Sequence, residues 1–262
     1  VASGVFQAEE EAQAMPMVKT FLKPKGEHWH RWIERRPVQL MVLSLVVILI
    51  GGIIEIVPTM MIKTNVPTIE SVKPYTVLEL EGRDLYIREG CNACHSQMVR
   101  PFRSETARYG EYSKAGEFVY DHPFLWGSKR TGPDLHRLGG KYSHSWHYNH
   151  MLDPTSMSPK SIMPRYPWLF ENTLDRSISK NKLEAMVSLG VPYSMEYIDN
   201  WEAEMDKQAE EIAGQIKREI NVEINSSDEI VALIAYLQRL GIDIKAGEAS
   251  AATKATTATS QN

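Results

Sequence analysis

The feature that most constrains the fold is a run of about 18 residues without a charged side chain, from Pro37 to Ile54. As an α-helix this run spans about 27 Å, close to the ~30 Å hydrocarbon core of a bilayer. Apolar residues continue past Glu55, so we predict a transmembrane helix over residues 37–62. A cleaved signal peptide is the alternative, but its apolar region is shorter, and no small-residue cleavage site follows Glu55.

Positive charges are distributed unequally around this span, since only Lys63 and Lys73 follow it closely. Because cytoplasmic flanks carry the excess of Lys and Arg, we expect residues 1–36 in the cytoplasm and residues 63–245 in the periplasm. Glu55 either pairs with a partner or reaches the outer interface, and the sequence leaves both open. The cations that precede the span are Lys19, Lys23, Lys25, Arg31, Arg35 and Arg36.

The hydrophobic pattern after the span is helical, and no segment shows sustained strand alternation, so we expect a mainly α fold. Thr76 and Glu79 have the spacing of a capping box, in which each side chain binds the other residue's backbone. They predict a helix that begins after Thr76 and ends near Gly90, directly before the two cysteines.

Three further segments complete the organisation of the chain. Ser226 and Glu229 have the spacing of a second capping box and predict a helix that ends at Gly241. Residues 195–220 predict one long, charged amphipathic helix whose apolar side packs on this chain, on another subunit or on the membrane. Residues 246–262, dominated by Ala, Thr and Ser, are expected to be disordered.

The chemistry of the chain is concentrated in Cys91-Asn92-Ala93-Cys94-His95, which holds both of its cysteines. This C-x-x-C-H spacing is typical of covalent haem attachment. Two thiols one helical turn apart each form a thioether to a haem vinyl group, and the adjacent imidazole is then brought under the iron. The motif therefore predicts one haem c, bound through Cys91 and Cys94, with His95 as an axial ligand.

Zinc binding and dithiol redox chemistry are the alternatives for a C-x-x-C pair. A redox dithiol of the thioredoxin type requires a βαβ setting, which the helical pattern does not provide. A zinc site requires two more ligands, and none of the available histidines forms a second pair with cysteine at the usual spacing. These histidines are His122, His136, His144, His147 and His150.

The second axial ligand has several candidates among the 12 methionines. Met163 is favoured because it lies in Ser-Ile-Met-Pro-Arg-Tyr-Pro-Trp, where prolines stiffen an extended loop. Met157, Met151 and Met98 are its rivals. A His/Met pair would fill both axial positions and leave none for oxygen chemistry.

A resemblance to known proteins begins at residues 131–135. Their sequence, Thr-Gly-Pro-Asp-Leu, resembles the Gly-Pro-x-Leu element of class I cytochromes c, in which the proline carbonyl accepts a hydrogen bond from the proximal histidine. The resemblance implies that Pro133 orients His95, as the outer hydrogen-bond partners of iron ligands commonly do. An ordinary Gly-Pro turn is the alternative.

Longer strings resemble the mono-haem cytochrome c subunit of cbb3-type cytochrome c oxidases. They are Cys-Asn-Ala-Cys-His-Ser-Gln-Met-Val-Arg-Pro-Phe-Arg from Cys91, residues 116–135, and Met-Pro-Arg-Tyr-Pro-Trp-Leu from Met163. The resemblance covers roughly residues 37–190 and the last helix, and it strengthens Met163 as the second ligand. It implies a membrane helix followed by a class I cytochrome c-like domain with an enlarged insert between His95 and Pro133.

This resemblance also implies a role and partners. Such a subunit passes electrons from a di-haem cytochrome c subunit to the haem b and copper of the catalytic subunit, in the bacterial inner membrane, and performs no bond chemistry itself. The insert fits a docking surface on the catalytic subunit, where Ser128 is a candidate ligand of an interfacial calcium ion. The long stretch before residue 37 and the charged helix near residues 201–220 depart from the family pattern and leave other respiratory partners open.

Other functions are also compatible with these sequence features. The small cytochrome c subunit of a nitric oxide reductase also has one span and one haem c. A haem sensor or a zinc-stabilised module is a hypothesis from a different class of function. Nucleic acid is not expected as a partner, because 29 Lys and Arg against 33 Asp and Glu create no overall positive field.

Overall fold

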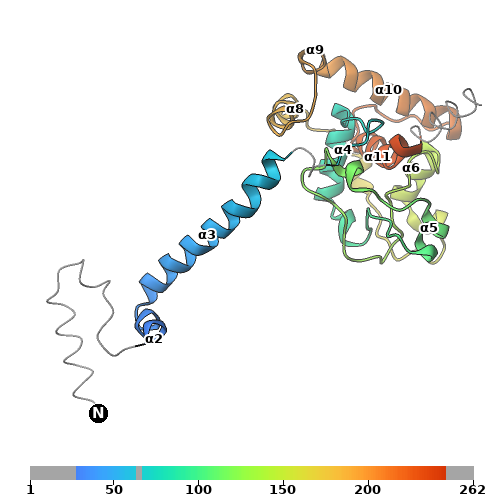
Figure 1. Ribbon diagram of the computed structural model, residues 1–262. Coiled ribbons are helices and arrows are strands. Elements are labelled where there is room, and N and C mark those ends of the chain that lie inside the picture. The colour runs from blue at the N-terminus through green and yellow to red at the C-terminus, as the bar shows by residue number, and fades with distance from the viewer. Residues whose placement is uncertain (1–27, 63–66, 246–262) are drawn as a thin grey trace, which may run out of the picture. The chain divides into compact units, whose positions relative to one another are not determined.

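The computed structural model describes residues 28–62 and 67–245 (Figure 1). The predicted disordered tail, Lys63 and most of the expected cytoplasmic segment lie outside these residues. The chain divides into two compact units, Val1–Asn65 and Val66–Asn262. Within the described ranges the structure is helical and no strand forms, as the hydrophobic pattern predicts.

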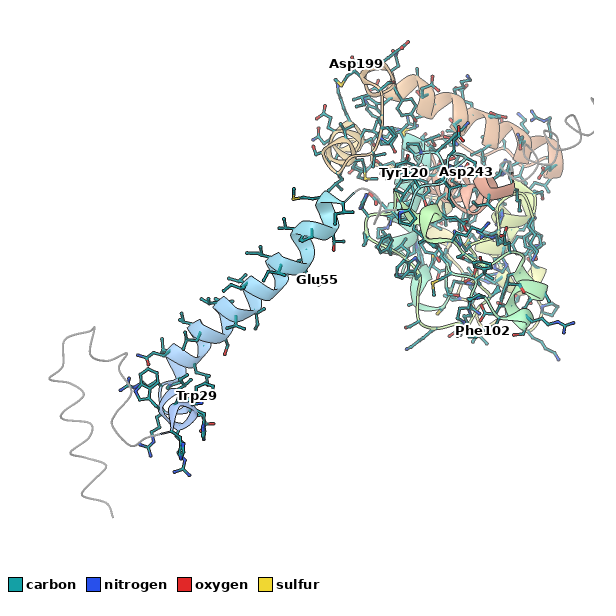
Figure 2. The ribbon with its side chains drawn as sticks, viewed as in Figure 1. Trp29, Glu55, Phe102, Tyr120, Asp199 and Asp243 are labelled. Atoms are coloured by element: carbon teal, nitrogen blue, oxygen red, sulfur yellow. The ribbon has the colours of Figure 1, made fainter. Side chains whose placement is uncertain are left out.

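The first unit contains the short helix α2 (Trp29–Glu34) and the long helix α3 (Pro37–Met61). Pro37 occupies the first turn of α3, where its missing N–H costs no hydrogen bond. The helix continues past Glu55, whose side chain is exposed (Figure 2). The apolar side chains of α3 are exposed as well, and Pro37–Thr59 is the one candidate membrane span in the described part of the chain.

The second unit is built around two helices, α4 (Val77–Arg88) and α11 (Glu229–Arg239), which pack closely against each other. Their contact includes the buried rings of Tyr86 and Tyr236, whose centroids are 5.3 Å apart. The other helices are α5 (Arg103–Tyr109), α6 (His144–Leu152), α7 (Pro154–Met157), α8 (Ser179–Ser188), α9 (Met195–Asp199) and α10 (Trp201–Ile220), with 3-10 turns η3 (Cys91–Ala93), η4 (Ala115–Phe118) and η5 (Pro167–Phe170).

Gly82 allows α4 to approach the backbone of α11. A Cβ atom at this position would lie 1.9 Å from the carbonyl oxygen of Ala232 and 2.9 Å from the Cβ of Tyr236. No side chain larger than hydrogen fits into that space. The residue thus sets the distance between the two central helices.

The capping box predicted at the start of α4 is confirmed. The Glu79 N–H donates to Thr76 Oγ1 over 3.2 Å, and the Thr76 N–H donates to Glu79 Oε2 over 2.8 Å. Gly90, with a φ of 69°, reverses the chain after the helix, where the sequence predicts its end.

The second predicted capping box is wrong. Asp228 is the N-cap of α11, and no side chain caps the helix. Glu229 instead accepts two hydrogen bonds from the Arg88 guanidinium, over 2.7 and 2.6 Å. A bidentate charge-assisted pair is stronger than a neutral cap, and Arg88, distant in sequence, reaches Glu229 only because α4 packs on α11.

The amphipathic stretch of residues 195–220 forms two helices, α9 and α10, with a break at Asn200. The apolar side of α10 packs on α4, α6 and α11 (Figure 1). From sequence, this apolar side could pack on this chain, on another subunit or on the membrane. The structure shows that it packs on the core of this chain. The buried residues of α10 are Met205, Ala209, Ile212 and Ile216.

A pair of glycine substitutions tests the packing of α4 on α11. We expect Gly82→Ala to destabilise the domain by about 1–3 kcal/mol or more, because the new methyl group overlaps the α11 backbone. Gly214→Ala is the matched control, since its Cβ meets only Arg218 Nη1, at 3.5 Å. It should stabilise α10 by about 0.5–1 kcal/mol. Thermal unfolding of the full chain in detergent measures both effects, and equal melting temperatures for the two variants would contradict this account.

Candidate functional site: the Cys91–His95 turn

The C-x-x-C-H segment begins where α4 ends. After Gly90 the chain forms the 3-10 turn η3, and the His95 N–H donates to the Cys91 carbonyl oxygen over 2.9 Å. Cys91 is buried in the hydrophobic core, and burial raises the pKa of its thiol to about 12. Cys94 is exposed, and neither thiol forms a disulfide. The turn thus directs one thiol inward and the other outward.

The imidazole of His95 is oriented by Pro133. Its Nδ1 atom lies 2.9 Å from the Pro133 carbonyl oxygen. Because a carbonyl only accepts, Nδ1 carries the proton in this contact, and the lone pair of Nε2 is free for a metal. Burial lowers the pKa of His95, which favours the neutral ligand form.

Backbone hydrogen bonds fasten the Pro133 segment to the cysteine turn. The Gly132 N–H donates to the Cys94 carbonyl over 2.9 Å, and the Leu135 N–H donates to the Ser96 carbonyl over 2.8 Å. Since these bonds lie on either side of Pro133, its carbonyl is held at a fixed position beside His95. The hydrogen bond therefore does not depend on a flexible side chain.

Gly132 forms a cradle for the His95 ring. A Cβ atom there would lie 2.2 Å from Cε1 and 2.6 Å from Nδ1 of His95. Gly127 contacts the same turn from another segment, since its Cβ would lie 3.0 Å from the His95 carbonyl oxygen. Both positions require a residue without a side chain.

Asp134 and Arg130 complete the support of the turn, and sequence reasoning did not single them out. Asp134 Oδ2 accepts from Ser96 Oγ over 2.7 Å and from the Met98 N–H over 2.8 Å. Arg130 donates to the same Ser96 Oγ and to Glu105, each over 2.7 Å. An acidic residue directly after Gly-Pro was the available signal, but its partners are distant in sequence.

The loop that carries Met163 is anchored beside the cysteine turn. Trp168 Nε1 donates to Glu89 Oε2 over 3.0 Å, and Glu89 directly follows α4. Burial raises the pKa of Tyr166, which is in the same loop, to about 12. Met163 itself is partly buried against the core. Among its rivals, Met151 is buried in that core, and Met98 and Met157 are partly buried.

The features of the turn fit a covalently bound haem. An exposed thiol lies next to a histidine with a free Nε2, and the loop of a candidate second ligand is nearby.

Two buried nitrogens on α6, His147 Nε2 and His150 Nδ1, have no hydrogen-bond partner among the described residues. Within the same residues, no group of three or more His, Cys, Asp or Glu side chains has the arrangement of a metal site.

A family model agrees with this geometry. The model described as cytochrome c oxidase, mono-haem subunit/FixO, matches residues 30–244. The chain belongs to the FixO family. No individually curated protein matches the chain.

The FixO match spans α3, the cysteine turn and α11, so the membrane-span candidate and the haem-site candidate belong to one family unit. The resemblance inferred from the strings near Cys91 and Met163 is thereby confirmed at the level of the family. Membership also makes the chain a subunit of a cytochrome c oxidase, and the family name implies one haem in this subunit.

Ser128, the candidate calcium ligand, is exposed and directly follows Gly127. Its segment is held to the cysteine turn by the Gln97 N–H, which donates to the Trp126 carbonyl over 2.8 Å. The rings of Phe124 and Trp126 stack with centroids 4.6 Å apart, and the two residues are 54% and 39% exposed. The insert thus presents Ser128 and an aromatic pair at the surface next to His95.

The glycine cradle generates a prediction. Gly132→Ala should displace the His95 ring and break its hydrogen bond to Pro133, because the added methyl group overlaps the imidazole. We expect a reduced fraction of chains that carry haem, measured as Soret absorbance per protein after purification. Gly214→Ala is again the control, since the added Cβ on α10 meets only Arg218 Nη1, at 3.5 Å. Normal haem content in Gly132→Ala would show that the cradle is not needed.

Proposed function

We propose that this chain is a membrane-anchored mono-haem c-type cytochrome of a cbb3-type oxidase. It relays electrons from a di-haem cytochrome c subunit to the haem b and copper of the catalytic subunit, which reduces oxygen to water. The observation that carries the proposal is the His95–Pro133 hydrogen bond beside C-x-x-C-H. A histidine oriented in this way by a backbone carbonyl is what a haem iron requires of its ligand.

The residues have distinct roles in this proposal. Cys91 and Cys94 form the thioether links, and His95 and Met163 are the axial ligands. A bound haem would supply one-electron redox chemistry. Because side chains of this chain would fill both axial positions, oxygen finds no open site here, and the chain itself catalyses no bond chemistry.

Support for the ligand set comes from the rigidity of its surroundings. Asp134, Arg130 and the Gly132 cradle restrict the movement of the His95 turn. A ligand that moves little between oxidation states lowers the reorganisation needed for electron transfer. A His/Met pair also raises the potential, which suits a carrier upstream of oxygen.

The location follows from α3 and its flanking charges. We propose a single pass through the bacterial inner membrane, with the N-terminal segment in the cytoplasm and the haem domain in the periplasm. The catalytic subunit would contact α3 and the insert, with Ser128 as a ligand of a calcium ion between the subunits. Exposure of Ser128 and of the Phe124–Trp126 pair supports this interface.

Membership of the FixO family favours an oxidase over the nitric oxide reductase considered from sequence. Purification of the complex that contains this chain, followed by assays of oxygen and nitric oxide consumption, separates the two functions. Turnover of oxygen with a reduced cytochrome c donor is the expected result, whereas turnover of nitric oxide alone would reassign the complex.

Covalent attachment has a direct test. The matured full chain should carry the mass of one haem and give a pyridine haemochrome spectrum of a ring with two thioether links. Cys91→Ala should leave at most one link, which shifts the haemochrome band because one vinyl group stays conjugated. An unmodified mass with two free thiols would overturn the proposed function.

The second ligand is tested by Met163→Ala. We expect the haem to stay attached through Cys91 and Cys94, while the near-infrared band of the Met–iron bond disappears. Met157→Ala, from the same region of the chain, is the matched control and should keep the band. If Met163→Ala keeps the band instead, another methionine binds the iron.

A further inference from the structure

The last turn of α6 lies against the Met163 loop. His150 is on this turn, and the neighbouring Met151 carbonyl accepts a hydrogen bond from the Tyr166 N–H over 3.1 Å. The loop between Met163 and Tyr166 is therefore folded back onto the part of α6 that carries His150.

The ring of His150 has a defined orientation. It stacks on Trp146 with a centroid distance of 4.6 Å and an interplanar angle of 19°. Its Nδ1 is shielded from solvent and has no hydrogen-bond partner among the described residues. A buried polar atom without a partner costs about 1–3 kcal/mol. Such an atom points to a group that the folded chain itself does not provide.

A second contact anchors the same loop near the cysteine turn. Trp168 Nε1 donates to Glu89 Oε2 over 3.0 Å, and Glu89 lies two residues before Cys91. The segment that carries Met163 is therefore held both at the turn of His150 and beside the cysteine turn.

The other two histidines of α6 have different surroundings. His144 Nδ1 lies 3.2 Å from Gln238 Nε2 and so has a partner. His147 has an unpartnered Nε2, but the charges that lower its pKa, after burial, are those of His144 and His150. Of the three, His150 is the one that directly precedes Met151, whose carbonyl accepts the hydrogen bond from the Met163 loop.

We propose that His150 is a reserve ligand of the haem iron, which would bind when Met163 is removed. This inference rests on the proposed function, since it requires a haem held by Cys91, Cys94 and His95. Imidazole is a common axial ligand of haem iron, and the thioether links keep the iron in place while the ligand changes. In a chain without Met163, an imidazole nitrogen would bind in place of the missing sulfur, and no electron is transferred.

The experiment compares the native chain with Met163→Ala and with Met163→Ala/His150→Ala, as full chains in detergent. Met163→Ala should remain low-spin, with the electron paramagnetic resonance signature of two imidazoles, and its midpoint potential should fall because a His/His pair favours ferric iron more than His/Met. The double variant should become high-spin. External imidazole should return it to low-spin, which shows that its haem cleft is still folded.

Two controls sharpen the assignment. Met163→Ala/His144→Ala removes a histidine from the same helix and should stay low-spin, since His144 contacts Gln238. His150→Ala alone should keep the near-infrared Met–iron band, because His150 is not a ligand while Met163 is present. Loss of that band would show that Met163 binds the iron only when His150 is present, and it would overturn the reserve role.

The inference is overturned if Met163→Ala is high-spin, or if the double variant with His150→Ala stays low-spin. A failure of the proposed function looks different, since the native chain would then carry no covalent haem in the pyridine haemochrome assay. The two failures are therefore separable within one set of samples.

Discussion

The crossing of α4 and α11 at Gly82 determines where the Cys91–His95 turn begins. Since α4 ends three residues before Cys91, any shift of the helix on α11 moves both cysteines and His95. The Arg88–Glu229 ion pair links the end of α4 to the start of α11 and restrains the same region. α10 and α6 then pack around this pair of helices, so the position of the turn depends on one close helix contact.

Beyond the contact between α4 and α11, His95 is held in place mainly by backbone groups. The Pro133 carbonyl orients His95, two backbone hydrogen bonds hold the Pro133 segment, and Gly132 leaves room for the ring. Backbone groups lose little conformational freedom when a ligand binds, because the fold has already ordered them. The position of His95 therefore depends on groups that the fold itself orders.

Local patterns predicted several elements well and others poorly. α3 and the Thr76 box depend on residues close together in sequence, and both agree with the structure. The Ser226 box has the same local spacing but is wrong, because Glu229 finds a stronger partner in Arg88. The role of Asp134, which accepts from Ser96 and Met98, likewise depends on partners that are distant in sequence.

By itself the sequence determined the apolar span, the C-x-x-C-H motif, the mainly helical class and the resemblance to a cytochrome oxidase subunit. These depend on composition and short spacing, which act within a few residues along the chain. Only the tertiary structure decided that α10 covers this chain's own core and that Glu229 pairs with Arg88. It also decided that the end of α6, with His150 and Met151, holds the Met163 loop through the Tyr166 N–H. Contacts between residues so distant in sequence exist only after the helices have packed, because packing energy and not local preference brings them together.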